Sequence, residues 1–245
     1  MSKNTQIALF EDELAKLADA AVVAERSTAA TAFMSTKGGI LSYQGNPIAG
    51  NSLEVVIIAS PVERLYYASR YDPTKPSGPA CYALAVASSG MKPSAAAPEP
   101  QCATCQGCPK DEWGSSPTGG KGKACRETRR ILMIPADACS SHDAVATAEV
   151  AALRPPVTSL KGFATYLQTV ATGTRRPLAA VVTRISVAPD PKTQFKVQFD
   201  FVRAIEDIEV VKALIERGQR ETDNAIASAG MEEEHTPEAA QSSKF

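Results

Sequence analysis

The strongest constraint on this chain is a cluster of cysteines near its middle. The spacing C-x2-C-x2-C-x16-C is formed by Cys102, Cys105, Cys108 and Cys125. A C-x2-C pair supplies two thiolates from one tight turn, and distant partners complete the tetrahedral shell of a structural zinc site. The loop over 109–123 is too rich in Gly, Pro and Ser to hold itself, so a metal would contribute to its folding directly. The spacing therefore predicts a structural zinc site with four sulfur ligands.

An iron–sulfur cluster is the alternative, because C-x2-C-x2-C followed by a further cysteine also resembles part of a ferredoxin pattern. That pattern expects a proline next to the last cysteine, whereas here Pro109 follows the third one. Zinc is therefore favoured. Cys81 and Cys139 stand apart in the sequence and are expected to be small buried residues rather than ligands.

The sequence predicts a protein of the cytoplasm. It contains no apolar run long enough to cross a bilayer, and acidic residues interrupt the N-terminal region where a secretory signal would need an apolar core. In a reducing compartment, clustered cysteines indicate metal ligands rather than disulfides.

Hydrophobic periodicity predicts an α+β fold built on a small antiparallel sheet or barrel. Helical spacing of apolar residues covers 10–26, 159–173 and 207–217, with Ser159 as a cap and with Gly173 and Gly218 as ends. Strand patterns cover 38–43, 53–59, 64–68, 81–87, 129–135, 178–187 and 195–201, with a turn over 188–191. The stretch 136–152 supports no prediction.

Three regions follow from this order of elements. Residues 1–34 form an N-terminal helical segment, and residues 35–222 form the main domain, which includes the cysteine knuckle over 101–126. Residues 223–245 are polar and acidic and predict a disordered tail.

Basic and aromatic residues gather around the knuckle and the early strands. Proteins that hold single-stranded nucleic acid without reading its sequence combine a cationic groove with aromatic faces on which bases stack. The net charge of −1 does not exclude a polyanionic partner, because the acidic tail offsets a basic remainder. The candidate contacts are Lys121, Lys123, Arg126, Arg129, Arg130 and Arg184 for phosphates, and Trp113, Tyr43, Tyr66, Tyr67 and Tyr71 for bases.

Signals for catalysis are missing from the sequence. The glycine-rich loop fails as a phosphate-binding loop, because Lys123 is followed by Ala124 rather than Ser or Thr. The two histidines, His142 and His235, have no recognisable partnership with a nucleophile. The sequence therefore predicts a binding protein rather than an enzyme.

Several short motifs together resemble a family of bacteriophage single-stranded DNA-binding proteins with a zinc-knuckle insertion. The resemblance covers residues 35–205 and is carried by Tyr66-Tyr67, Tyr71-Asp72-Pro73, Cys81-Tyr82-Ala83, Cys105-x2-Cys108-Pro109-x3-Trp113-Gly114-Ser115, Gly120-Lys121-Gly122-Lys123-Ala124-Cys125, Arg129-Arg130, Pro155-Pro156-x2-Ser159-Leu160-Lys161 and Val182-Thr183-Arg184.

This resemblance implies an OB-like barrel that binds single-stranded DNA in phage DNA replication, recombination or repair, in the host cytoplasm. The acidic tail ends at Phe245 and would recruit replication or recombination proteins, although Ser242-Ser243-Lys244 precede that residue where acidic residues are usual. Two alternatives stay open: a phage structural or assembly protein with a structural zinc site, and an iron–sulfur nucleic-acid or redox protein.

Overall fold

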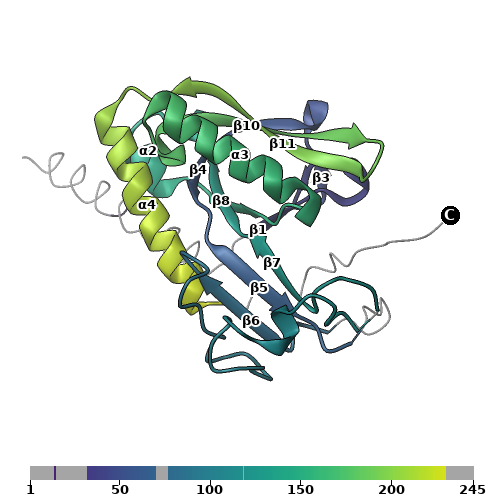
Figure 1. Cartoon of the computed structure of the whole chain (residues 1–245). Helices are drawn as coiled ribbons and strands as arrows, with labels where there is room; N and C mark the ends of the chain where they lie inside the picture. Colours follow the sequence, from purple (N-terminus) through teal and green to yellow (C-terminus); the bar gives the residue numbers. More distant parts are fainter. Residues whose placement is uncertain (1–13, 15–31, 70–76, 118, 230–245) are drawn as a thin grey trace, which may run out of the picture. The chain divides into compact units, whose positions relative to one another are not determined.

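The computed structural model describes Leu14 and residues 32–69, 77–117 and 119–229 (Figure 1). The helix predicted over 10–26 lies outside the described residues, apart from Leu14. Tyr71 and residues 230–245 of the predicted tail also lie outside them.

The described strands form two sheets, one of eight strands and one of three. In chain order the strands are β1 (Ala32–Ser35), β2 (Ser42–Tyr43), β3 (Asn46–Pro47), β4 (Ser52–Ala59), β5 (Val62–Tyr66), β6 (Cys81–Ala85), β7 (Cys125–Arg129), β8 (Ile131–Pro135), β9 (Ala151–Leu153), β10 (Val181–Asp190) and β11 (Gln194–Ala204). The larger sheet has the order β11-β10-β4-β8-β9-β1-β2-β3, and the smaller sheet has the order β6-β5-β7. Within these sheets only β1 and β9 pair in parallel.

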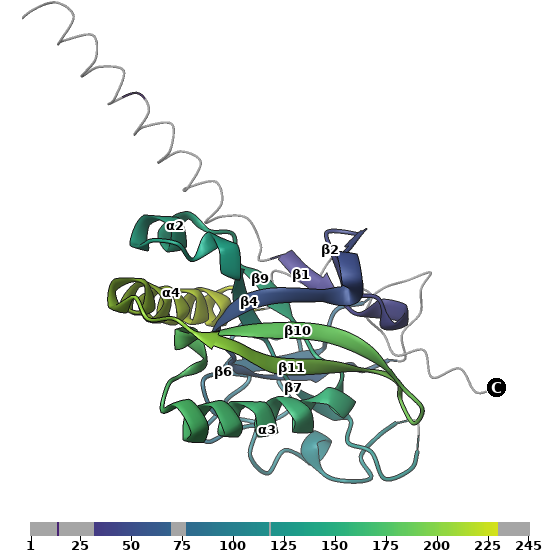
Figure 2. The same cartoon turned by 90° about the horizontal axis from the view of Figure 1, so that it is seen from above.

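The described residues also form five short 3-10 helices and three longer helices, α2 (His142–Thr147), α3 (Val157–Thr174) and α4 (Ile208–Ala227). The larger sheet is curled and mostly antiparallel (Figure 2). The predicted α+β class is therefore confirmed.

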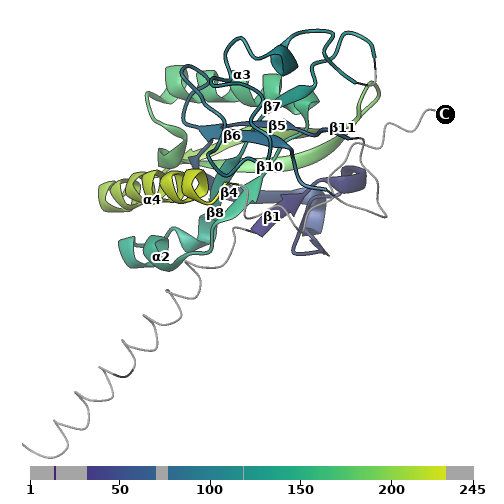
Figure 3. The ribbon, with the colours of Figure 1, turned by 90° about the horizontal axis from the view of Figure 1, so that it is seen from below.

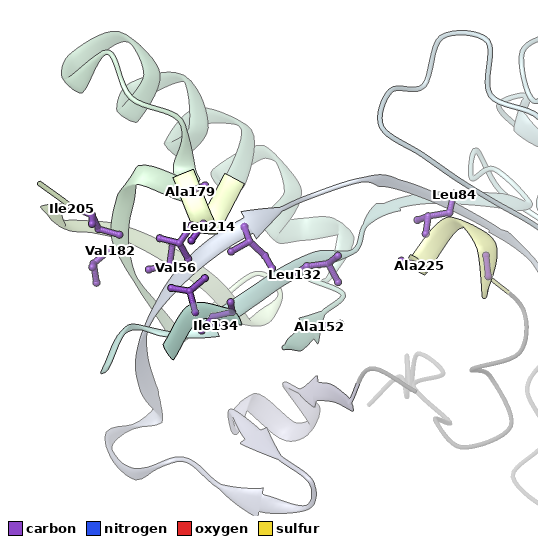
Figure 4. Close-up of a cluster of buried hydrophobic side chains, with 14 of the residues drawn as sticks. Val56, Leu84, Leu132, Ile134, Ala152, Ala179, Val182, Ile205, Leu214 and Ala225 are labelled. Carbon is purple, nitrogen blue, oxygen red and sulfur yellow. The ribbon is translucent and has the colours of Figure 1, made fainter. Parts of the chain in front are cut away.

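Both faces of the larger sheet are buried around residues 55–58 of β4, which explains the unbroken apolar run there. Val55 belongs to an apolar cluster that includes Phe163 of α3. The next residue, Val56, belongs to a second cluster that includes Leu214 of α4 (Figure 4). Because successive strand residues point to opposite faces, α3 covers one face, and α4 with α2 covers the other (Figures 2 and 3). Burial of each such side chain contributes roughly 1.5–3 kcal/mol.

Two strands of the larger sheet continue into the smaller one. β4 leads into β5 through Ser60 and Pro61, and β7 leads into β8 through Arg130, whose N–H donates to the Pro61 carbonyl at 3.0 Å. The pairing of β4 with β8 shifts between Ile57 and Ala59, and a bulge of this kind bends a strand. The two strand pairs therefore form one bent ribbon (Figure 1), whose far end carries cysteines.

Helix α3 lies close to its predicted range, but Ser159 is not its cap. Ser159 is buried within the first turn, and its hydroxyl accepts a hydrogen bond from the Val197 N–H at 3.0 Å. Pro156 precedes the first helical residue instead. Ser159 thus ties α3 to β11 rather than capping the helix.

Helix α4 begins as predicted after Asp207, whose carboxylate accepts hydrogen bonds from the N–H groups of Glu209 and Val210 at 2.9 and 3.2 Å. It does not end at Gly218 but continues to Ala227. Residues 223–227, which the sequence assigned to the disordered tail, are therefore helical.

Other boundaries also differ from the prediction. The turn expected over 188–191 begins later, because β10 extends to Asp190 and the carboxylate of that residue accepts hydrogen bonds from the next turn. Residues 32–34, assigned to the N-terminal helical segment, belong to β1. The stretch 136–152 contains α2 and the start of β9. None of the helices within the described residues is long and apolar enough to cross a membrane.

Candidate metal centre and nucleic-acid interface

The register of the smaller sheet places two cysteines beside one tyrosine. Tyr66 of the central strand β5 lies opposite Cys81 of β6 on one side and opposite Cys125 of β7 on the other. Residues directly opposite each other across a ladder point to the same face. The same face also carries Arg64, which lies opposite Glu127. This row forms the floor of the candidate metal centre.

The segment that leads to the other cysteines runs along β6. The Ser94 N–H donates to the Tyr82 carbonyl at 2.8 Å, and the Glu99 N–H donates to the Ala80 carbonyl at 2.7 Å. The two carbonyls flank Cys81 in the chain. The segment is therefore attached to β6 on both sides of Cys81.

A small apolar cluster packs the segment that carries Cys102, Cys105 and Cys108, called the cysteine loop below, against the smaller sheet. Cys105 is buried together with Val62, Ala83 and Met91, and the Cys105 N–H donates to the Met91 carbonyl at 2.9 Å. The carbonyl of Cys105 accepts a hydrogen bond from Arg64 at 3.1 Å. This cluster is far smaller than the two clusters that cover the larger sheet. Apolar burial alone gives the cysteine loop little stability.

A pocket of about 20 Å³ lies between the loop and the sheet. That volume is enough for one water-sized occupant. The thiols that line the pocket are those of Cys81, Cys102, Cys105, Cys108 and Cys125. Four of them are the predicted ligands, and the fifth, Cys81, is buried as predicted but does not stand apart from the others in space.

The donor set suits a thiophilic metal. All six cysteines are free thiols, and burial raises the pKa of Cys105 and raises that of Cys125 to about 12. Arg64 beside these thiols opposes the shift in both cases and would offset the negative charge of metal-bound thiolates. As the side chains stand, no three His, Cys, Asp or Glu groups of the described residues form a ready metal-binding set. The residue types that line the pocket thus fit a thiophilic metal. The positions of the sulfur atoms are no evidence for or against one.

Charged side chains connect the pocket to the loop above it. Arg64 donates to Asp111 at 2.9 Å and to Glu127 at 2.6 Å, and Lys123 contacts the other carboxylate oxygen of Asp111 at 3.0 Å. Side-chain exposure is only 11% for Arg64 and 18% for Asp111. This network fixes the start and the end of the 109–123 loop relative to the sheet.

The loop presents an exposed tryptophan beside a lysine. Trp113 is 78% exposed, and Nζ of Lys123 lies 5.3 Å from the centroid of the Trp113 ring. The loop closes on itself through Gly122, whose carbonyl accepts hydrogen bonds from the N–H groups of Gly114 and Ser116 at 3.0 and 3.1 Å. Trp113 is therefore held outward by a closed turn, with a cation over one side of its ring.

A second lysine–aromatic pair lies nearby. Nζ of Lys110 lies 5.1 Å from the centroid of the Tyr66 ring, and both residues line the thiol pocket. Lys121, in the same loop as Trp113, is exposed. The structure thus places Lys123 against Trp113 and Lys110 against Tyr66, with Lys121 exposed in the loop that carries Trp113.

The basic strand that follows the knuckle does not form one cationic surface. Because β7 alternates, Arg126 points to the face opposite Cys125, whereas Arg129 shares the face of Cys125 and donates to the Ser60 carbonyl at 3.0 Å. Arg130 is 2% exposed, so its prediction as a phosphate contact is wrong.

Arg130 instead belongs to a buried ion cluster at the bend of the ribbon. Its guanidinium pairs with Glu63, which also accepts hydrogen bonds from Arg154 at 2.6 and 2.9 Å. Burial alone would raise the pKa of Glu63, but hydrogen bonds and charge from Arg154 and Arg130 outweigh burial and lower it. Phe33 lies against both guanidinium groups, 4.1 Å from that of Arg154.

The remaining candidates lie on other surfaces. Tyr43 in β2 belongs to the larger sheet, and its hydroxyl donates to Glu149 at 2.5 Å. Arg184 in β10 is also in the larger sheet and pairs with Glu54 at 2.7 Å. Tyr67 is exposed and follows β5. Tyr43 and Arg184 therefore do not join the Trp113 loop.

Sequence reasoning missed Cys81 and Lys110. The signal for Cys81 was strand register, because Cys81 and Cys125 line the same pocket only when their two strands flank β5. The signal for Lys110 was its place directly after Cys108-Pro109, where a short turn lifts it above the sheet. Searches of protein-family models, of curated proteins and of solved structures found no match to this chain.

Proposed function

We propose that this chain is a non-enzymatic, sequence-tolerant single-stranded DNA-binding protein whose thiol pocket holds a structural metal ion. The observation that carries the proposal is the exposed Trp113 ring on a closed, lysine-bearing loop. A large apolar ring at 78% exposure has little structural reason to face solvent, because its burial would stabilise the fold.

The loop has the chemistry of a stacking platform. A base can stack on the ring face of Trp113 that Lys123 does not cover, while Lys121 and Lys110 lie within the same loop to meet phosphates. Base–aromatic stacking tolerates any sequence because every base has a π-face, and each stack contributes roughly 1–3 kcal/mol. Duplex DNA keeps its bases stacked inside, so this platform favours single strands.

The metal would hold this platform in place. The loop has no large apolar cluster of its own, and a metal bound by four pocket thiols would cross-link it to the smaller sheet. Zinc is the proposed ion because it is satisfied by four sulfurs without an open position.

The family resemblance extends the proposal to biology. The curled, mostly antiparallel sheet is compatible with an OB-like barrel. On that reading the protein acts in phage DNA replication, recombination or repair in the host cytoplasm, and its acidic C-terminal segment recruits partner proteins.

The test is fluorescence anisotropy with labelled single-stranded and duplex oligonucleotides at two salt concentrations, before and after chelation. We expect tight binding to single strands of unrelated sequence, weak binding to duplex, a steep loss with salt, and a loss after chelation. No affinity for any oligonucleotide, or equal affinity for single strand and duplex, would overturn the proposal. A brown preparation with visible absorption would replace zinc by an iron–sulfur cluster.

A further inference from the structure

We propose that Cys81 is a ligand of the metal and that it takes the place which the sequence spacing gives to Cys125. The ligand set is then Cys81 with Cys102, Cys105 and Cys108. This inference rests on the metal site of the proposed function and is independent of DNA binding.

The first support is the path of the chain. The segment before Cys102 is hydrogen-bonded to Tyr82 of β6 and to Ala80 just before that strand, the two neighbours of Cys81. Cys105 packs on Ala83, which lies two residues further along β6 on the same face as Cys81. The chain thus enters the pocket along β6, the strand that carries Cys81.

The second support is burial. Cys81, Cys105 and Cys108 are 9%, 8% and 8% exposed, whereas Cys102 and Cys125 are both partly buried. Of the two strand cysteines, Cys81 is the more buried residue, and a structural site that excludes water favours it.

The third support is the separation of the two strand cysteines. Cys81 and Cys125 flank Tyr66, so two strand spacings separate them, about 9–10 Å between backbones. Two sulfurs on one zinc lie within about 4.6 Å of each other, because each Zn–S bond is about 2.3 Å. Both cysteines could reach one zinc only by leaning toward each other across Tyr66, whose side chain shares their face and lies between them. A zinc that binds the loop cysteines therefore takes one of the two strand cysteines, and the path of the chain along β6 favours Cys81.

The experiment compares full-length variants Cys81→Ser, Cys81→Ala, Cys105→Ser, Cys125→Ser and Cys139→Ser with the wild type. Zinc content is measured by elemental analysis, and Co²⁺ affinity by the intensity of the thiolate-to-metal absorption. Cys139→Ser is the matched control, because Cys139 lies outside the pocket and contacts the Pro135 carbonyl at 3.5 Å. Circular dichroism confirms that each variant is folded, and the Ala variant separates loss of a ligand from burial of a hydroxyl.

We expect Cys81→Ser and Cys81→Ala to weaken Co²⁺ binding as much as Cys105→Ser does, by more than the roughly 10–100-fold that loss of an outer-shell partner causes. Cys125→Ser and Cys139→Ser should bind as the wild type does. Unchanged binding by folded Cys81 variants, or loss of binding by Cys125→Ser, overturns the inference. A wild type that binds neither metal overturns the metal site itself, while the oligonucleotide titration still decides DNA binding.

Discussion

Gly218 in the middle of α4 lies directly against the backbone carbonyl of Ile58, at the bulge where the central ribbon bends. A Cβ on Gly218 would lie 2.2 Å from the Ile58 oxygen and 3.0 Å from its carbonyl carbon. The helix crosses the ribbon at this point only because residue 218 has no side chain. The glycine that signals a helix end in the sequence is therefore a packing contact.

Gly218→Ala should destabilise the protein by about 1–3 kcal/mol, the usual cost of overpacking. The sign of this change in stability is informative, because replacing a glycine inside a helix by alanine normally stabilises the helix. The matched control is Gly162→Ala in α3, where a Cβ meets nothing within 4 Å and where we expect a gain of about 0.4–1 kcal/mol. Denaturant unfolding measures both variants, and a gain at both positions would contradict the contact.

Glu63→Gln should cost about 3–5 kcal/mol at neutral pH, because it removes the carboxylate that pairs with buried Arg130 and with Arg154. Glu54→Gln is the control: Glu54 and Arg184 form an exposed pair, whose loss costs about 0–1 kcal/mol. Urea unfolding at pH 7 measures both, and equal effects would refute the structural role of the ion cluster.

The same variant predicts a pH dependence. The pKa of Glu63 is lowered in the fold, so its contribution is complete above the ordinary glutamate value of 4.5 and is lost as pH falls through the lower folded value. The wild type and Glu63→Gln should therefore converge in stability as the pH falls below about 4.5. A difference between them that stays constant with pH would show that Glu63 is not charged in the fold.

The sequence predicted most elements because apolar periodicity reports burial. Its errors have specific causes. Gly218 and Ser159 were assigned by local signals, a helix stop and a cap, but tertiary contacts with Ile58 and Val197 decide their roles. The sequence predicts one cationic surface for the run after the knuckle, although successive side chains of a strand point to opposite faces. Arg130 is buried because its guanidinium pairs with Glu63. The sequence could not show that Cys81 lines the pocket. Cys81 is brought there by the pairing of β6 with β5, which its separation from the other cysteines along the chain does not reveal.

Trp113→Ala should weaken single-stranded DNA binding by about 1–3 kcal/mol, roughly 5- to 150-fold. Because Trp113 is the only tryptophan, the wild type gives a direct readout: its fluorescence should be quenched by single strands and little changed by duplex. Phe201→Ala, which removes an exposed aromatic from β11, should leave affinity unchanged. If single strands quench the wild-type fluorescence but Trp113→Ala binds them with unchanged affinity, the base lies near the ring and does not stack on it.

Chelation should loosen the 109–123 loop before the rest of the fold. With the proposed metal in the pocket, the loop would depend on that metal, whereas the larger sheet is held by two extensive apolar clusters. Limited proteolysis after chelation should cleave between Lys110 and Lys123 while the fragment that contains β8 to α4 stays intact. Cleavage spread evenly over the chain would mean that the loop is not a separately stabilised unit.

Lys110→Gln combined with Lys121→Gln should flatten the salt dependence of binding. Each lost phosphate contact reduces the slope of log K against log salt by about 0.7 on a single strand, so the double variant should lose about 1.4. The control is Lys212→Gln, which removes a lysine from the exposed face of α4 where it pairs with Glu209 at 2.9 Å. Because all variants lose similar overall charge per substitution, an equal change in slope per substitution would indicate diffuse attraction. A change confined to the loop variants would locate the phosphates beside Trp113.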